Sequence, residues 1–196
     1  MIRRATVLLT AIVAAIVVAS GMGLSQTVPD SPRYAVKDLG ILPGGSLNPD
    51  YGSIAYGIND SGEVVGVAPN SSSTHAFLYS DGQMQDLGTL PDGTESQSYD
   101  INNSGQIVGD SERVNWDGTR TSTAFLYKDG QTQNLNNLVP AGSSYLYSAR
   151  AINTSGQIVG QLSRHAFLYS GGQIQDLGTL GGGVDRSSAF DLNDSG

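Results

Sequence analysis

Ile58-Asn59-Asp60-Ser61-Gly62-Glu63-Val64-Val65-Gly66 is the stretch that decides the fold, because the chain repeats it. It returns over residues 101–109 and 152–160, and a fourth copy begins at Leu192. Each copy has the pattern of a strand end, a tight turn and the start of a second strand. Asn and Gly tolerate positive φ, Asn and Ser side chains can bond to the turn backbone, and β-branched residues follow. We therefore interpret six residues as structural turn positions: Asn59, Gly62, Asn102, Gly105, Asn153 and Gly156.

Two more motifs recur in a fixed order after this turn. His75-Ala76-Phe77-Leu78-Tyr79 has counterparts at 123–127 and 165–169, and Asp86-Leu87-Gly88-Thr89-Leu90 has counterparts at 134–138 and 176–180, with an earlier match at 38–42. A turn pair lies between the two motifs, and it is a strong hairpin signal. The turn pairs are Asp81-Gly82, Asp129-Gly130 and Gly171-Gly172. One repeat is therefore predicted to contain four short strands.

The repeat length points to one architecture. The phenylalanines of the second motif, Phe77, Phe125 and Phe167, are 48 and then 42 residues apart. A period in the forties with four strands favours propeller blades over the shorter coils of a β-helix. We predict an all-β fold of propeller-like tandem four-stranded antiparallel blades, about three blades plus a fragment. The expected boundaries are a signal peptide at 1–25, a linker at 26–32, a lone fourth strand at 33–42, repeats at 43–90, 91–138 and 139–180, and a partial repeat at 181–196.

The fourth strand has an unusual spacing. Met84, Leu87 and Leu90 are three residues apart, as are their counterparts in the third repeat, whereas a regular strand alternates by two. We expect a bulge or bend near the glycine, which has no Cβ to oppose it. A helical turn is the alternative. No segment after the leader has the pattern of a long helix.

The N-terminus has the pattern of a secretory signal helix. Met1-Ile2-Arg3-Arg4 is a short basic start, Val7 to Ala19 is apolar except for Thr10, and small residues follow. Cleavage is expected between Ala19 and Gln26, which predicts a secreted or cell-envelope protein. The alternative is an uncleaved anchor, since residues 5–24 are just long enough to span a bilayer. No second apolar run of that length occurs, so no membrane association is expected beyond this signal.

Composition excludes several partners. The chain has 196 residues and no cysteine, so an exported form would depend on its own core and sheet hydrogen bonds. Two of the ten basic residues lie in the leader and all eighteen acidic residues lie beyond it, which leaves a net charge of −10 on the remainder. This charge argues against binding to nucleic acid or an anionic membrane surface.

Some connections between strands have the same length in every repeat, and others do not. The turns from first to second and from third to fourth strand keep their length, whereas the other two connections vary. In an up-and-down meander the variable connections leave from the same edge, so they are expected to gather on one face, where such repeats usually bind. The alternative is that they are unconstrained solvent loops.

Non-repeating residues on these connections are the candidates for binding. Trp116, the only tryptophan, lies with Arg113 and Arg120 in the longest connection from second to third strand, and Tyr145 and Tyr147 lie in a connection from fourth to first strand. Aromatic rings beside an arginine suit contacts with a protein or glycan. The alternative is that they hold their own loops against the blade edge.

These motifs resemble the HAF-repeat family of extracellular repeat proteins. The resemblance rests on Ala55 to Gly66, His75 to Tyr79 and Asp86 to Leu90, with the most faithful ending at Asp176 to Gly182, and it covers residues 33–196. The second repeat departs from the pattern, with Thr123 at the position of the histidine. The resemblance implies export and a propeller-like all-β fold, and it brings no activity and no catalytic residues.

No cofactor, metal site or catalytic group is predicted. Asp60 is replaced by Asn103 and Thr154 in the later turns, so no carboxylate is kept for calcium. His75 and His165 occupy one strand position, which Thr123 fills in the second repeat, so a hydrogen-bonded strand residue is expected there. No Gly-x-Ser-x-Gly elbow occurs.

The sequence therefore favours a non-catalytic secreted or cell-envelope module that binds an unknown protein or glycan ligand. The alternatives are a propeller-type extracellular enzyme, a hydrolase or lyase, and a purely structural surface spacer. Three blades and a fragment fall short of the usual four to eight, which predicts a piece of a longer repeat protein. An open strand edge near the C-terminus predicts self-association.

Overall fold

The computed structural model describes residues 35–45, 52–181 and 186–196. The chain divides into a unit of residues 1–38 and a unit of residues 39–196, and the sheets belong to the second unit. The expected signal peptide at 1–25 and linker at 26–32 lie outside the described residues. In the part of the chain that the structure describes, no helix is long and apolar enough to cross a membrane.

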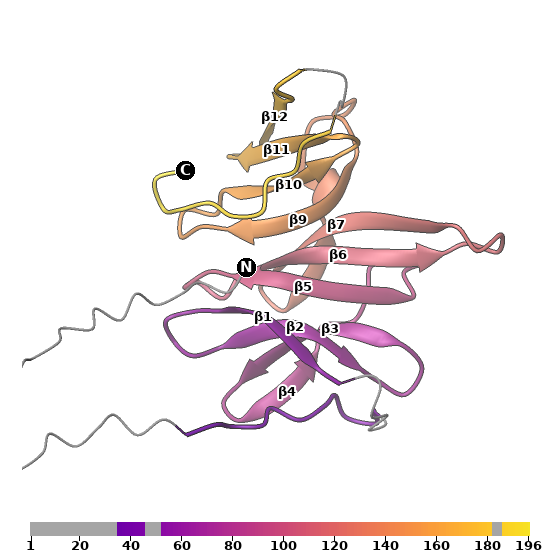
Figure 1. Ribbon diagram of the computed structural model, residues 1–196, viewed down its shortest axis with the longest axis vertical. Helices are drawn as coiled ribbons and strands as arrows, with labels where there is room; N and C mark the ends of the chain where they lie inside the picture. The colour runs from indigo at the N-terminus through magenta and orange to yellow at the C-terminus, as the bar shows by residue number, and fades with distance from the viewer. Residues whose placement is uncertain (1–34, 46–51, 182–185) are drawn as a thin grey trace, which may run out of the picture. The chain divides into compact units, whose positions relative to one another are not determined.

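The second unit contains three four-stranded antiparallel sheets, each built from four consecutive strands (Figure 1). The first sheet contains β1 (Ile54–Ile58), β2 (Val64–Pro69), β3 (Thr74–Ser80) and β4 (Gln83–Asp86). The second contains β5 (Glu95–Ile101), β6 (Ile107–Val114), β7 (Arg120–Lys128) and β8 (Gln131–Asn134). The third contains β9 (Leu146–Ile152), β10 (Ile158–Leu162), β11 (His165–Ser170) and β12 (Gln173–Gly178). The predicted all-β fold with four strands per repeat is confirmed.

The first strand of the second and third sheets packs against the sheet that precedes it. β5 contacts β2 and β3 of the first sheet, and β9 contacts β6 and β7 of the second. The apolar core between the first two sheets includes Val65, Leu87 and Ile101, and the core between the last two includes Val108, Leu135 and Ile152. The same repeat positions therefore supply both cores.

The aromatic motif and the turn motif meet inside each sheet. Gly66 pairs with Phe77, Gly109 with Phe125 and Gly160 with Phe167, and all three phenylalanines are fully buried. A Cβ at Gly109 would lie 2.7 Å from the Phe125 ring and 2.0 Å from the carbonyl oxygen of Gln97. The repeated glycine thus makes room for the ring and for the neighbouring strand.

The turns that open each repeat are held by asparagine side chains. Oδ1 of Asn59 accepts hydrogen bonds from the backbone N–H groups of Ser61 and Glu63, at 3.1 and 3.0 Å. Asn102 repeats both bonds in its own turn, and Oδ1 of Asn153 accepts the N–H of Gln157 and the hydroxyl of Ser155. Gly62, Gly105 and Gly156 take the positive φ values, between 74° and 79°.

The second kind of turn has the geometry that its sequence predicts. Asp81 and Gly82 both have positive φ, 52° and 82°, and Asp129 and Gly130 have nearly the same values. Two adjacent residues with positive φ define the turn that matches the twist of a two-residue hairpin.

The expected bulge near the fourth-strand glycine occurs in the third repeat. Phe167 pairs with Asp176 and Ala166 with Gly178, so Leu177 is the extra residue, and Gly178 has a φ of 66°. The second repeat has the helical alternative instead, a short 3₁₀ helix at Leu135–Leu138 capped by the side chain of Asn134. Asn136 stands there in place of glycine, and a residue with a Cβ adopts positive φ less readily.

Two flanking segments were expected to supply strands. Residues 35–42 form no ladder in the structure, although Leu42 buries its side chain against Ala68 and Phe77. Residues 186–196 also have no assigned strand, but they follow the third sheet closely, since Ala189 N–H donates to the carbonyl of Gly160 at 3.3 Å. Both segments therefore add packing rather than complete strands.

Candidate functional site

Trp116 lies at the tip of the β6–β7 hairpin, which projects past the neighbouring strands (Figure 1). Its side chain is 99% exposed. The turn beneath it is well ordered by hydrogen bonds, because Asn115 N–H donates to the carbonyl of Thr119 at 2.8 Å and the Asn115 amide donates to the hydroxyls of Thr119 and Thr121. The indole is thus held in solvent on a fixed turn.

The two predicted arginines of this hairpin have different surroundings. Nε of Arg113 donates to Oδ1 of Asn115 at 2.9 Å, beside the tip. The guanidinium of Arg120 donates to Glu95 at 2.7 Å and also to Glu112. Arg120 therefore joins the start of β7, beside the turn, to β5, as expected of a residue that holds its own loop.

The two predicted tyrosines contact each other. The rings of Tyr145 and Tyr147 are 5.0 Å apart in an edge-to-face arrangement, and both are about two-fifths exposed. The Tyr145 hydroxyl lies 2.5 Å from the hydroxyl of Thr123 on β7. The structure brings these tyrosines together, and in the residues that it describes no ring contact or hydrogen bond links them to Trp116.

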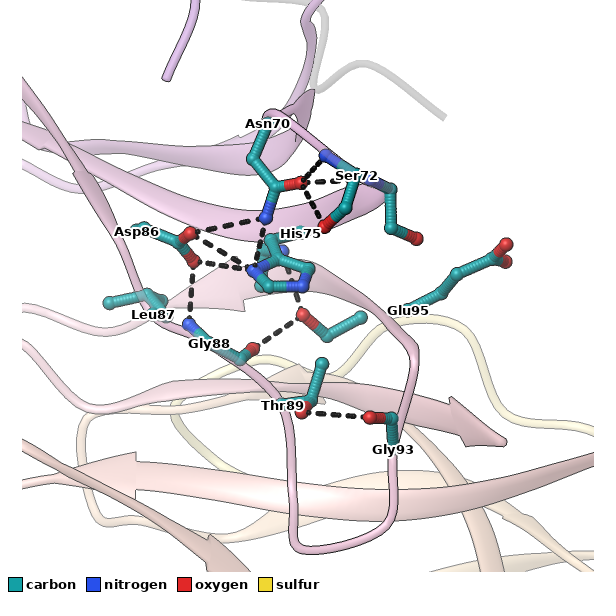
Figure 2. A network of polar contacts seen from close by, with 12 residues as sticks. Asn70, Ser72, His75, Asp86, Leu87, Gly88, Thr89, Gly93 and Glu95 are labelled. Carbon is teal, nitrogen blue, oxygen red and sulfur yellow. Dashed lines mark hydrogen bonds and ion pairs between the residues drawn. The ribbon is translucent and has the colours of Figure 1, made fainter. Parts of the chain in front are cut away.

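Each histidine belongs to a small polar network at the end of a fourth strand. Nδ1 of His75 lies 2.9 Å from both carboxylate oxygens of Asp86, whose Oδ1 accepts the backbone N–H of Gly88 at 2.7 Å (Figure 2). His165 and Asp176 repeat this contact in the third sheet, where the His165 hydrogen bond and then the Gly178 N–H lower the pKa of Asp176. In the second repeat both partners change together, to Thr123 and Asn134. The pairing of His with Asp therefore shapes the strand end, as expected of a strand residue.

The hydroxyl nearest this network is already used. Ser96 Oγ accepts the N–H of Ala76 at 2.9 Å and donates to the carbonyl of Gly88 at 2.6 Å. A nucleophilic serine would instead need its proton directed at a histidine nitrogen. Over residues 35–45, 52–181 and 186–196, no group of three His, Cys, Asp or Glu side chains is arranged to hold a metal ion.

Sequence reasoning missed a row of large side chains on the first strands. β1, β5 and β9 each have an irregular register, and the extra residue is Tyr56, Tyr99 or Arg150. Each stands three positions before its repeat asparagine, and Phe190 has the same position before Asn193. Bulges re-aim side chains, often beside sites. The available signal was a large, variable residue inside an otherwise constant strand.

These four side chains contact one another in order. The rings of Tyr56 and Tyr99 are 5.7 Å apart, the Arg150 guanidinium carbon lies 4.1 Å from the centre of the Tyr99 ring, and it lies 5.9 Å from the centre of the Phe190 ring. We call Tyr56, Tyr99, Arg150 and Phe190 the inner-strand row. It places one cation between aromatic faces.

A buried carboxylate lies beside this row. Asp110 is only 6% exposed, and its Oδ2 accepts the Tyr99 hydroxyl at 3.0 Å. Burial raises the pKa of Asp110, and this effect outweighs the hydroxyls and the Arg150 charge, which favour the ionised form. Burial, followed by the Asp110 charge, also raises the pKa of Tyr99. Asp110 has no acidic counterpart in the other repeats, where Val67 and Gln161 occupy its position.

Comparison of the sequence with known protein families gives a match. The sequence model of DUF3466, described as a protein of unknown function, matches residues 47–184, more than half of the chain. The chain belongs to the DUF3466 family. No curated protein matches it.

The DUF3466 segment contains all twelve strands of the three sheets, since β1 begins at Ile54 and β12 ends at Gly178. It also contains the predicted binding residues and three members of the inner-strand row. Phe190 lies just beyond it. The DUF3466 family description gives no activity, so function has to be argued from these sites.

Proposed function

We propose that this DUF3466 protein is a non-catalytic, secreted or cell-envelope binding module that contacts a glycan through Trp116. The observation that carries the proposal is a fully exposed indole on a turn fixed by four hydrogen bonds from Asn115 and Gly118. An exposed tryptophan presents a large apolar face to water, and flat aromatic faces suit sugar rings and protein anchors alike. A turn that is formed before binding lowers the cost of ordering the backbone that carries the ring.

The neighbouring groups fit a contact surface better than a reaction centre. Arg113 is bonded to Asn115 at the base of the tip and has further N–H donors to offer a ligand. Tyr145 and Tyr147 add an exposed aromatic pair at the start of β9, the strand that packs against β6 and β7; Tyr145 lies just before the strand and Tyr147 within it. A protein ligand is the second candidate, because the same groups are enriched at protein interfaces.

The three sheets also have features of propeller blades. We propose that the sheets are successive propeller-type blades of the HAF-repeat kind. In support, each sheet is a four-stranded meander, each first strand packs against the previous sheet, and the turn asparagines bond from one sheet to the next. Radial repetition of four-stranded sheets is the propeller arrangement.

Two alternative functions are a structural surface spacer and an extracellular enzyme. A spacer is supported by the repeat-equivalent polar groups, which bond within and between the sheets. An enzyme is supported only by the His–Asp pairs, whose aspartates also accept a backbone N–H. The proposed export is supported by the leader pattern at residues 1–25 of the sequence.

The test is retention on insoluble polysaccharides and glycan arrays by the secreted chain. Trp116→Ala is expected to weaken binding by about tenfold or more, the effect of losing an aromatic anchor. Val114→Ala, on the same hairpin, is the matched control and should change little. Tyr145→Ala with Tyr147→Ala tests the second pair. Retention that is unchanged in the Trp116 variant would remove the proposal.

A further inference from the structure

The inner-strand row contains an arginine with unused hydrogen-bonding capacity. Among the residues that the structure describes, the Arg150 guanidinium has ring contacts with Tyr99 and Phe190 but no hydrogen bond or ion pair. Arginine carries five N–H donors in a planar fork, which matches a carboxylate in two-point contact. The contact with Tyr99 holds the guanidinium 4.1 Å from the ring centre, and its N–H groups have no hydrogen-bond partner among the described residues.

The arginine of the row is a positive charge in an acidic chain. The part of the chain beyond the leader carries a net charge of −10, and Arg120, by contrast, is paired with two carboxylates. The Asp110 carboxylate interacts electrostatically with Arg150 but forms no ion pair with it, and it accepts the Tyr99 hydroxyl instead. Arg150 is half-buried, where a charge interacts more strongly than in bulk water.

The aromatic residues at the two ends of the row are accessible to solvent. Tyr56 is about half exposed and Phe190 is 70% exposed. A cavity of about 300 Å³ adjoins Tyr56 and is lined in addition by polar groups of Ser53, Thr74 and Gln97. Rings that flank a fixed cation, beside hydroxyls and an amide, form a surface with apolar faces and directional donors.

We propose that the inner-strand row is a second binding site, distinct from Trp116, for a saccharide that carries a single uronic acid carboxylate among neutral sugar rings, since one arginine on a chain of net charge −10 matches one carboxylate rather than a polyanion. The Arg150 fork binds one carboxylate in two-point contact. The faces of Tyr56 and Phe190 stack against adjoining sugar rings, and the polar lining near Tyr56 bonds ring hydroxyls. A neutral saccharide would leave the guanidinium unused, and a single terminal carboxylate of a peptide would leave the flanking rings unused.

The test uses a disaccharide of one glucuronate and one xylose and its methyl ester, titrated calorimetrically into the full chain at low salt. The ester has the same rings without the charge, so it is expected to bind about tenfold more weakly or worse. Arg150→Ala should lose affinity to the same extent for the acid and little for the ester. Arg150→Lys should recover only part, because an ammonium is a point charge without a planar fork. Lys128→Ala removes one exposed positive charge elsewhere and should leave the affinity nearly unchanged.

Three results would overturn the proposal. One is equal binding of the acid and the ester. Another is unchanged affinity in an Arg150→Ala variant whose melting temperature matches that of the unmodified chain. The third is an acetylated tripeptide with a free C-terminal carboxylate binding as tightly as the acid disaccharide. Polysaccharide retention that is unchanged in Trp116→Ala, together with acid binding that is lost in Arg150→Ala, would remove the Trp116 site alone, so failure of the two sites is distinguishable.

Discussion

The side-chain amide of Asn102 donates a hydrogen bond to the backbone carbonyl of Asn153, 3.0 Å away and one repeat further along the chain. Asn59 makes the same bond to Asn102 at 3.3 Å, and Asn153 makes it to Asn193 at 3.1 Å. Within each turn, the same amide also donates to the side chain of Glu63, Gln106 or Gln157. The turn motif therefore joins neighbouring repeats as well as neighbouring strands.

Asn102→Ala is expected to destabilise the protein by about 1–3 kcal/mol, because it leaves buried backbone groups without partners. Asn102 is 4% exposed, and its Oδ1 also accepts the N–H groups of Ser104 and Gln106. Urea denaturation measures the change. Ser104→Ala, in the same turn, exposed and without a hydroxyl hydrogen bond among the described residues, is the control and should change the free energy of unfolding by no more than about 0.5 kcal/mol. Equal effects of the two substitutions would contradict the inter-repeat role of Asn102.

Gly109→Ala is expected to lower the free energy of unfolding by at least as much as Asn102→Ala. The new Cβ would lie 2.0 Å from the carbonyl oxygen of Gln97 and 2.7 Å from the Phe125 ring, so the strand or the ring has to move. Overpacking of this kind typically costs about 1–3 kcal/mol. Gly52→Ala is the matched control, since nothing lies within 4 Å of its added Cβ. A melting temperature unchanged by Gly109→Ala would show that the sheet yields there without cost.

The strands and hairpin turns could be predicted because their signals are local. Asp81-Gly82 determines a turn through its own backbone preferences, and the glycine opposite Phe77 belongs to a motif that repeats. The bulge near Gly178 could be anticipated from spacing alone. The 3₁₀ turn at Leu135–Leu138 was only the alternative, because it depends on how Asn134 caps the chain.

The inner-strand row could not be predicted because it depends on register. A one-residue irregularity in the pairing of β5 with β6 decides whether Tyr99 faces the core, the solvent or a neighbouring repeat. The residues near Tyr99 contain no sequence signal for that irregularity. The contact of Arg150 with Tyr99 further requires two sheets to pack side by side. The same holds for Asp110, whose sequence neighbours give no sign of its burial.

Self-association is expected through the outer part of the third sheet. Leu177 is about half exposed and Leu180 fully exposed, whereas their repeat equivalents Leu87 and Leu90 are buried against the next sheet. We expect wild-type chain to form concentration-dependent oligomers in sedimentation experiments, because uncovered apolar surface favours association. Leu177→Asp with Leu180→Asp should shift the protein toward monomer. Val114→Asp, on the β6–β7 hairpin, should not, and a wild-type protein that stays monomeric would contradict the expectation.

The buried carboxylate of Asp110 predicts a pH dependence of known sign. Its folded pKa is raised by burial above the unfolded value of about 3.9, so the folded state binds the proton more tightly. Relative to Asp110→Asn, the wild type should therefore gain stability as the pH falls from 7 through the raised pKa, and the difference should level off below about pH 4. Asp117, whose pKa is lowered by its hydrogen bonds with Thr119, should show the opposite sign in an Asp117→Asn comparison, though weakly because it is exposed. Urea denaturation at several pH values measures both differences. A constant gap between wild type and Asp110→Asn over that range would mean that burial does not perturb this carboxylate.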